Sequence, residues 1–224
     1  MVALFVILFV VLLLGIDLII QARSKQYPIM AAAPTGNNLA HDRETLRIPK
    51  SVFFHPGHTW ARLQDGDSLE IGVDDFVQKA LGGIDKVELP AVGQFVRQGD
   101  PVIMVSHNGH QLSLVAPASG YVRSVNRDAV ENPSMVSENP YREGWLMMIE
   151  PAELARNLSM LHVAEHAVGW IKEEVKRFRD FLNTSEAHPA LVGEAMYDGG
   201  VPMAGVLEQL DDQHLHEFEQ QFLR

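Results

Sequence analysis

The chain has 224 residues, of which 46% are hydrophobic, and a formal net charge of -11 at pH 7. This length has room for one or two small domains with appendages, and the negative charge argues against a nucleic-acid partner. Because the chain contains no cysteine, disulfides, thiolate metal sites and cysteine nucleophiles are excluded.

The first 20 residues are almost wholly aliphatic or Phe, and a helix of roughly 20 apolar residues crosses a bilayer. We therefore predict a transmembrane anchor over residues 1–21. A cleaved signal peptide is the alternative interpretation. It is disfavoured because no Lys or Arg precedes the apolar run, and the small residues at 31–33 lie far beyond its end.

Two cationic residues, Arg23 and Lys25, follow the predicted anchor. Such flanks tend to remain on the cytoplasmic side of a membrane. We expect a single-pass protein of the cell membrane, attached through residues 1–20, whose body faces the cytoplasm. Residues 22–50 mix Pro, Gly and Asn with scattered charge and show no apolar period, which predicts a linker.

A β-hairpin is predicted over residues 59–73, because Asp65-Gly66 separates two apolar runs. Asp74 then lies where it can cap a short helix, and Gly82 lies where it can end that helix in a left-handed conformation. Short apolar segments broken by Gly, Pro or Asp follow, which is typical of antiparallel strands. We predict these strands at 85–89, 94–97, 101–106, 111–115, 120–126 and 145–150.

The strands at 101–106 and 111–115 are joined through Asn108-Gly109, the preferred pair for a two-residue type I′ turn. They predict a hairpin with an exposed tip. The tip contains the candidate site residues Ser106, His107, Asn108, Gly109 and His110.

Ordered motifs around this hairpin are specific as a set. They are H-T-W at 58–60, V-E-L-P-A-V-G at 87–93, Q-G-D-P at 98–101, A-P-A-S-G at 116–120 and N-P-Y-R-E-G-W at 139–145. Residues 51–152 thereby resemble the H protein family of the glycine cleavage system. The resemblance implies a mainly β, lipoyl-type barrel-sandwich hybrid with a short helix. It also implies a carrier whose lipoyl group is attached to a lysine.

The hairpin tip departs from the family. The resemblance places the lipoylated lysine in an E-S-V-K-A segment, and an ungapped count back from Ala116-Pro117 puts Gly109 at that lysine and Ser106 at the acidic residue. Lys79 and Lys86 lie upstream, in the predicted helix and in the strand after it. A lipoyl arm needs a lysine amine, so we expect no lipoate, no other cofactor and no catalytic residue.

Three histidine pairs are candidate metal ligands. They are His55 and His58, His107 and His110, and His162 and His166, the last with Glu165 between them. A zinc site needs three or four ligands, and no third ligand is evident beside any pair. We expect no metal site, and we interpret His58 as structural.

The C-terminal part carries two helical patterns. Apolar residues spaced by three and four predict one amphipathic helix over residues 153–183. Residues 184–224 predict a loop and a second amphipathic helix from Val206 to Phe222. Docking of the two helices on each other is one interpretation, and binding of a partner is the other. The family usually ends soon after the β module, so both helices are expected to be additions.

No G-x-S-x-G elbow, P-loop or other nucleophile signature is present, so we expect a protein that is not an enzyme. Three functions remain open. The first is a membrane-tethered, non-lipoylated binding or scaffold protein, whose protein partners include those that recognise H proteins. The second is a true glycine cleavage carrier that shuttles the aminomethyl group on a lipoyl arm, which requires the missing lysine. The third is a membrane-fusion-type export adaptor, although such adaptors insert a long helical hairpin where this chain has a short tip.

Overall fold

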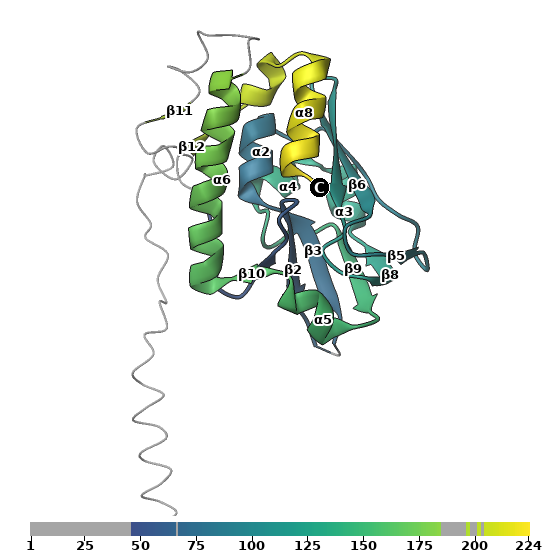
Figure 1. Cartoon of the computed structure of the whole chain (residues 1–224). Coiled ribbons are helices and arrows are strands. Elements are labelled where there is room, and N and C mark those ends of the chain that lie inside the picture. The colour runs from purple at the N-terminus through teal and green to yellow at the C-terminus, as the bar shows by residue number, and fades with distance from the viewer. Residues whose placement is uncertain (1–45, 66, 185–195, 198–200, 203) are drawn as a thin grey trace, which may run out of the picture. The chain divides into compact units, whose positions relative to one another are not determined.

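The computed structural model describes residues 46–65, 67–184, 196–197, 201–202 and 204–224 (Figure 1). The predicted anchor and residues 22–45 of the predicted linker lie outside this part of the chain. Within the described ranges, no helix is long and apolar enough to cross a membrane.

Two antiparallel sheets form the β module. The larger sheet has the strand order β10-β1-β2-β3-β9-β8-β5 and the smaller one the order β4-β6-β7. The larger sheet contains β1 (Phe53–Phe54), β2 (Thr59–Leu63), β3 (Leu69–Val73), β5 (Phe95–Val96), β8 (Gly120–Val125), β9 (Met147–Pro151) and β10 (His162–Val163). The smaller sheet contains β4 (Lys86–Glu88), β6 (Pro101–His107) and β7 (His110–Val115). A separate pair is formed by β11 (Met196–Tyr197) and β12 (Val201–Pro202).

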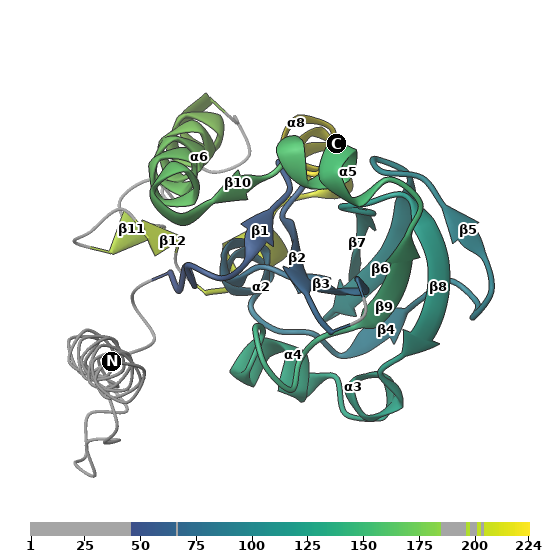
Figure 2. The same cartoon turned by 90° about the horizontal axis from the view of Figure 1, so that it is seen from below.

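The two sheets face each other (Figure 2), and the buried residues between them form one apolar cluster. Alternate residues of β6 and β7, among them Ile103 and Leu112, point into this interior and are fully buried. They belong to the same cluster as Ile71 and Ile149 of the larger sheet. The prediction of a mainly β fold followed by helices is confirmed. The unpredicted strands β1, β10, β11 and β12 have two residues each, which is too short to show a period of two.

The helix α2 (Asp75–Leu81) has the predicted ends. The Asp74 carboxylate accepts hydrogen bonds from the backbone N–H groups of Phe76 and Val77 at 3.1 Å each. Gly82 has φ 93°, and its N–H donates to carbonyls of the last turn. Two five-residue helices that the sequence did not predict, α3 (Arg127–Glu131) and α4 (Ser134–Glu138), follow β8.

The predicted helix over 153–183 is divided in the structure. It consists of α5 (Leu154–Ser159), the strand β10 and α6 (Ala164–Thr184). The break arises because His162 and Val163 pair with Phe54 and Phe53 of β1, so that sheet pairing overrides the helical period. Ala164 begins α6 with φ 51°.

The second predicted helix is divided as well. A 3-10 turn, η1 (Val206–Gln209), precedes α8 (Asp212–Phe222). The division falls at Asp211, whose side chain accepts a hydrogen bond from the His214 N–H at 2.9 Å and caps α8.

The C-terminal helices dock on each other and on α2 through an aromatic cluster. Phe178 of α6 contacts Phe76 of α2 and Phe222 of α8, with ring centroids 5.4 and 5.8 Å apart. Phe181 and Phe218 complete the cluster. The predicted helix pair is confirmed, with α2 as a third member. These residues belong to the same cluster that fills the β module, so the C-terminal helices and the module share one apolar core.

Candidate functional site at the hairpin tip

The β6–β7 hairpin closes in the predicted two-residue turn. His107 pairs with His110 at the last position of the ladder, and Asn108 and Gly109 have φ 49° and 89°. Positive φ at both central residues defines the type I′ turn. Ser106 lies one pair below, opposite Gln111 on β7 and Lys86 on β4.

Gly109 lies at the outer end of the hairpin, and nothing lies within 4 Å of the position that a Cβ would take. The two lysines of the region lie elsewhere. Lys79 is on α2 and pairs with Asp75 at 3.3 Å, and Lys86 is on β4 and pairs with Glu88 at 2.6 Å. The structure therefore places neither lysine in the turn.

The turn is held by two carboxylates from distant parts of the chain. His107 Nδ1 lies 3.0 Å from Asp85 Oδ1, and His107 Nε2 lies 3.2 Å from Glu208 Oε1. The Asn108 side-chain amide donates to Glu208 Oε2 at 3.1 Å, and the Asn108 backbone N–H donates to Asp85 Oδ2 at 2.9 Å. Glu208 belongs to η1, so the C-terminal segment contacts the tip directly.

The charge of Asp85 is stabilised by these contacts. The backbone N–H of Asn108 and the imidazole of His107 lower the pKa of the Asp85 carboxyl below its ordinary value. Each nitrogen of His107 lies close to a carboxylate oxygen, and the Asn108 side-chain amide also lies 3.3 Å from His107 Nε2.

A second contact from the C-terminal segment lies along the same hairpin. The Ser113 backbone N–H of β7 donates to Glu219 Oε1 of α8 at 2.6 Å. Because β7 is the edge strand of its sheet, this donor would otherwise lack a ladder partner. The helix α8 thus covers an edge that would be open to another strand.

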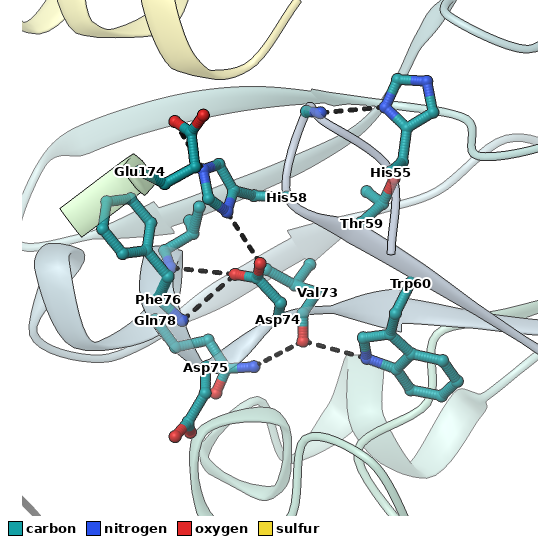
Figure 3. A network of polar contacts seen from close by, with 12 residues as sticks. His55, His58, Thr59, Trp60, Val73, Asp74, Asp75, Phe76, Gln78 and Glu174 are labelled. Carbon is teal, nitrogen blue, oxygen red and sulfur yellow. Dashed lines mark hydrogen bonds and ion pairs between the residues drawn. The ribbon is translucent and has the colours of Figure 1, made fainter. Parts of the chain in front are cut away.

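A buried polar network lies beneath α6 (Figure 3). His58 Nδ1 contacts Asp74 Oδ2 at 2.7 Å, and His58 Nε2 lies 4.0 Å from Glu174 Oε2. The side chain of His58 is 0% exposed and that of Glu174 is 6% exposed. Glu174 also pairs with Arg177 at 2.6 Å. The network connects His58 and Asp74 of the β module to Glu174 in the middle of α6.

Aromatic rings enclose His58 in this network. Its imidazole stacks on Phe76 with ring centroids 4.4 Å apart and lies 5.1 Å from the ring of Trp170. The backbone of His58 has φ 60°, a left-handed conformation that costs a residue with a Cβ about 1 kcal/mol or more. His58 is therefore a structural residue, as the sequence predicted.

His55 lies beside this network and accepts a hydrogen bond from the Gly57 N–H through Nδ1 at 2.9 Å (Figure 3). This nitrogen must be unprotonated to accept. Burial, with the nearby His58, lowers the pKa of His55 to about 4.

The pair His162 and His166 does not lie on one helix, contrary to the sequence interpretation. His162 belongs to β10 and stacks on Trp170 with centroids 5.1 Å apart. Burial lowers the pKa of His162, and His166 acts in the same direction while Glu174 opposes it. Among the residues with described positions, no group of three or more His, Asp or Glu side chains could hold a metal ion.

The sequence interpretation missed the residues that hold the tip. Glu208 lies 100 positions from Asn108, and in the sequence it is one of several acidic residues on a predicted helix face. Asp85 follows Gly82 and Gly83 in a short connection. A side chain that acts through a contact of such long range leaves no local pattern.

Comparisons with known proteins show which family the chain is similar to. A family model described as "Glycine cleavage H-protein" matches residues 52–174. The match includes α5, β10 and the first half of α6, which we expected to be additions. Only residues 175–224 follow the match, and they contain both Glu208 and Glu219.

Curated relatives are similar to this chain over the same region. A glycine cleavage system H protein of Geobacillus thermodenitrificans is 35% identical over 122 residues, which are 54% of this chain and 95% of the relative. One of Carboxydothermus hydrogenoformans is 39% identical over 115 residues, 50% of this chain and 88% of the relative. The crystal structure of a glycine cleavage system H protein from Mycobacterium marinum superposes with a TM-score of 0.49 at 29% identity, covering 55% of this chain and 97% of that one.

Proposed function

The chain belongs to the glycine cleavage H-protein family, and we propose that it acts as a non-lipoylated, non-catalytic binding or scaffold protein attached to the cell membrane through residues 1–20. The partners we propose are proteins, among them those that recognise H proteins. The single observation that carries the proposal is the tip of the β6–β7 hairpin, where the ungapped count from Ala116-Pro117 puts Gly109 at the position of the lipoyl lysine.

The chemistry of the turn supports this proposal. Lipoylation requires an amine that leaves the turn freely, whereas Gly109 has no side chain. Its neighbour Asn108 is engaged by Asp85 and Glu208. The turn therefore presents a short polar surface in place of a swinging arm. Such a surface suits recognition of a partner, not transport of a group between enzymes.

The membrane attachment rests on the apolar run at residues 1–20 and on the cationic residues after it. We propose that the β module faces the cytoplasm. Protease added to intact spheroplasts should leave the module uncut, while the same protease should digest it after the spheroplasts are lysed. Digestion before lysis would contradict the orientation and favour the export-adaptor function.

The test of the non-lipoylated state is intact-mass spectrometry after expression with lipoate and a lipoate ligase. The wild-type chain should show no lipoyl increment. The matched positive control is Gly109→Lys combined with Ser106→Glu, which restores the amine and the acidic residue of the family. The lysine costs about 1 kcal/mol because Gly109 has positive φ. This is a small part of the ~5–15 kcal/mol that typically stabilises a domain, so the control should fold.

A lipoyl increment on the wild-type chain, at Lys86 or at any other lysine, would contradict the proposal. The glycine cleavage carrier would then become the better supported function. A lipoylated control beside an unmodified wild type would establish that the fold still presents the tip to the ligase and that only the lysine is missing.

A further inference from the structure

We propose that the hairpin tip is a binding site for a side-chain carboxylate and that Glu208 is its resident ligand. The proposal rests on the proposed function and deepens it, because it names the chemistry that a non-lipoylated tip binds. Gly109, at the position of the family's lipoyl lysine, then lies beside a site that binds an anion.

Two nitrogens of the turn lie against the two oxygens of one carboxylate. His107 Nε2 lies 3.2 Å from Glu208 Oε1, and the Asn108 amide donates to Glu208 Oε2 at 3.1 Å. A carboxylate accepts on both oxygens, whereas a primary amide would place its own NH2 group against one of these nitrogens. The pair of nitrogens therefore selects a carboxylate over an amide of the same shape.

The site is also shaped to admit the carboxylate. A Cβ on Gly82 would collide with Glu208 Oε1, and a Cβ on Gly205 would lie 3.0 Å from that oxygen. A Cβ on Gly83 would lie 2.9 Å from the ring of His107. Three glycines from two separate segments thus leave the space in which the carboxylate and the imidazole meet.

The Glu208 carboxylate lies in negative surroundings. It lies against Gly82, at the C-terminal end of α2, where the helix dipole disfavours an anion. Asp85 adds a second negative charge on the other side of His107. The imidazole of His107 lies between the two carboxylates, 3.0 Å from Asp85 and 3.2 Å from Glu208.

The strength of the contact allows exchange. The side chains of His107 and Glu208 are 18% and 31% exposed, and ion pairs open to solvent stabilise by roughly 0–1 kcal/mol. As part of the same chain, Glu208 competes at an effective concentration on the order of millimolar. A partner's acidic side chain would replace Glu208 only if its dissociation constant for the open site were below this effective concentration.

The experiment removes the resident carboxylate and supplies a free one. Full-length Glu208→Ala is titrated with acetate at constant ionic strength, while NMR follows the His107 ring nitrogens and the Asn108 side-chain amide. Acetate should cause saturable shifts of both groups. Its apparent dissociation constant should be up to about fivefold lower than in the wild type, where Glu208 competes for the site with an ion-pair energy of roughly 0–1 kcal/mol. Acetamide, which is neutral and similar in shape, should cause no saturable shift.

Matched variants locate the effect. Glu217→Ala removes an exposed carboxylate of α8 that pairs with Gln213 at 3.0 Å, and it should create no acetate site. Glu208→Ala combined with His107→Phe should abolish the acetate response of the Asn108 amide.

Folded Glu208→Ala that shows no saturable shift with acetate, or equal shifts with acetate and acetamide, would overturn the carboxylate site. Such a result would leave the non-lipoylated state intact, because that state is measured by mass. A lipoylated wild type with a normal acetate response would instead overturn the proposed function alone.

Discussion

Two histidines connect the C-terminal helices to the β module, and they differ mainly in burial. His58 lies between Asp74 of the module and Glu174 of α6, and it is 0% exposed. His107 lies between Asp85 and Glu208 of η1, and it is 18% exposed. The first connection ends at the last residue of the family match, whereas the second involves a residue beyond it.

The difference in burial gives similar chemistry two roles. Removing one member of a buried charged network leaves its partner without solvent or counter-charge, which is strongly destabilising. Removing one member of a partly exposed pair lets water reach the remaining partner and costs less. The His58 network therefore fixes α6 to the module, while the His107 contact holds the tip in a form that can exchange.

The largest effect is expected from breaking the buried network. Glu174→Ala should lower the free energy of unfolding by about 1–3 kcal/mol, because it removes a buried carboxylate that lies 4.0 Å from His58 and pairs with Arg177, while Asp74 stays in contact with His58. Urea denaturation followed by circular dichroism measures the change. Glu173→Ala is the control, since Glu173 is 74% exposed and its loss should change the value by less than about 0.5 kcal/mol. Equal effects of the two variants would refute the distinction.

Acid tests the buried side of the comparison through His55, which lies beside the His58 network. The pKa of His55 is lowered to about 4 in the folded protein, against about 6.5 unfolded. The unfolded chain therefore binds the extra proton first as the pH falls. This contribution to stability is complete above pH 6.5 and decreases by roughly 2–3 kcal/mol towards pH 4.

His55→Asn keeps an acceptor for the Gly57 N–H and removes the titration. Its unfolding free energy should change less than that of the wild type between pH 7 and pH 4.5, as measured by urea denaturation at each pH. Parallel pH profiles of the two proteins would show that His55 is not buried in its neutral form.

The smallest effect is expected at the tip. Glu208→Gln keeps the shape of the side chain but places an NH2 group against one of the nitrogens of the tip. It should lower the free energy of unfolding by about 1 kcal/mol or less. The difference from wild type should shrink as salt is raised, because exposed ion pairs are screened. Paired urea titrations at low and high salt measure it. A loss of stability as large as that of Glu174→Ala would show that the tip contact is held as strongly as the His58 network, and would contradict the comparison.

Local signals predicted much of the fold. Asp74 and Gly82 end α2 as expected because caps depend on a few neighbouring residues. Asn108-Gly109 forms the expected turn because its backbone preference is intrinsic. His162 was assigned to a helix, and that assignment failed because pairing with β1, more than 100 residues away, decides its conformation.

The same reasoning explains what the sequence showed of the site. The absence of a tip lysine is visible by counting from Ala116-Pro117, without any structure. The contact of Glu208 with the tip cannot be recognised in the sequence, because an acidic residue is common on any solvated helix face. Only the fold brings Glu208 against Gly82 and His107.

The central claim is that the C-terminal segment lies on the tip where a carrier would present its arm. The chain has no cysteine, so Asn108→Cys with Glu208→Cys introduces two unique thiols at side chains that are in contact. A short thiol-reactive cross-linker should join them within one molecule in native buffer, far faster than in urea, as followed by peptide mass mapping. A cross-linking rate in native buffer no higher than in urea would show that the segment does not lie on the tip, and would contradict the account.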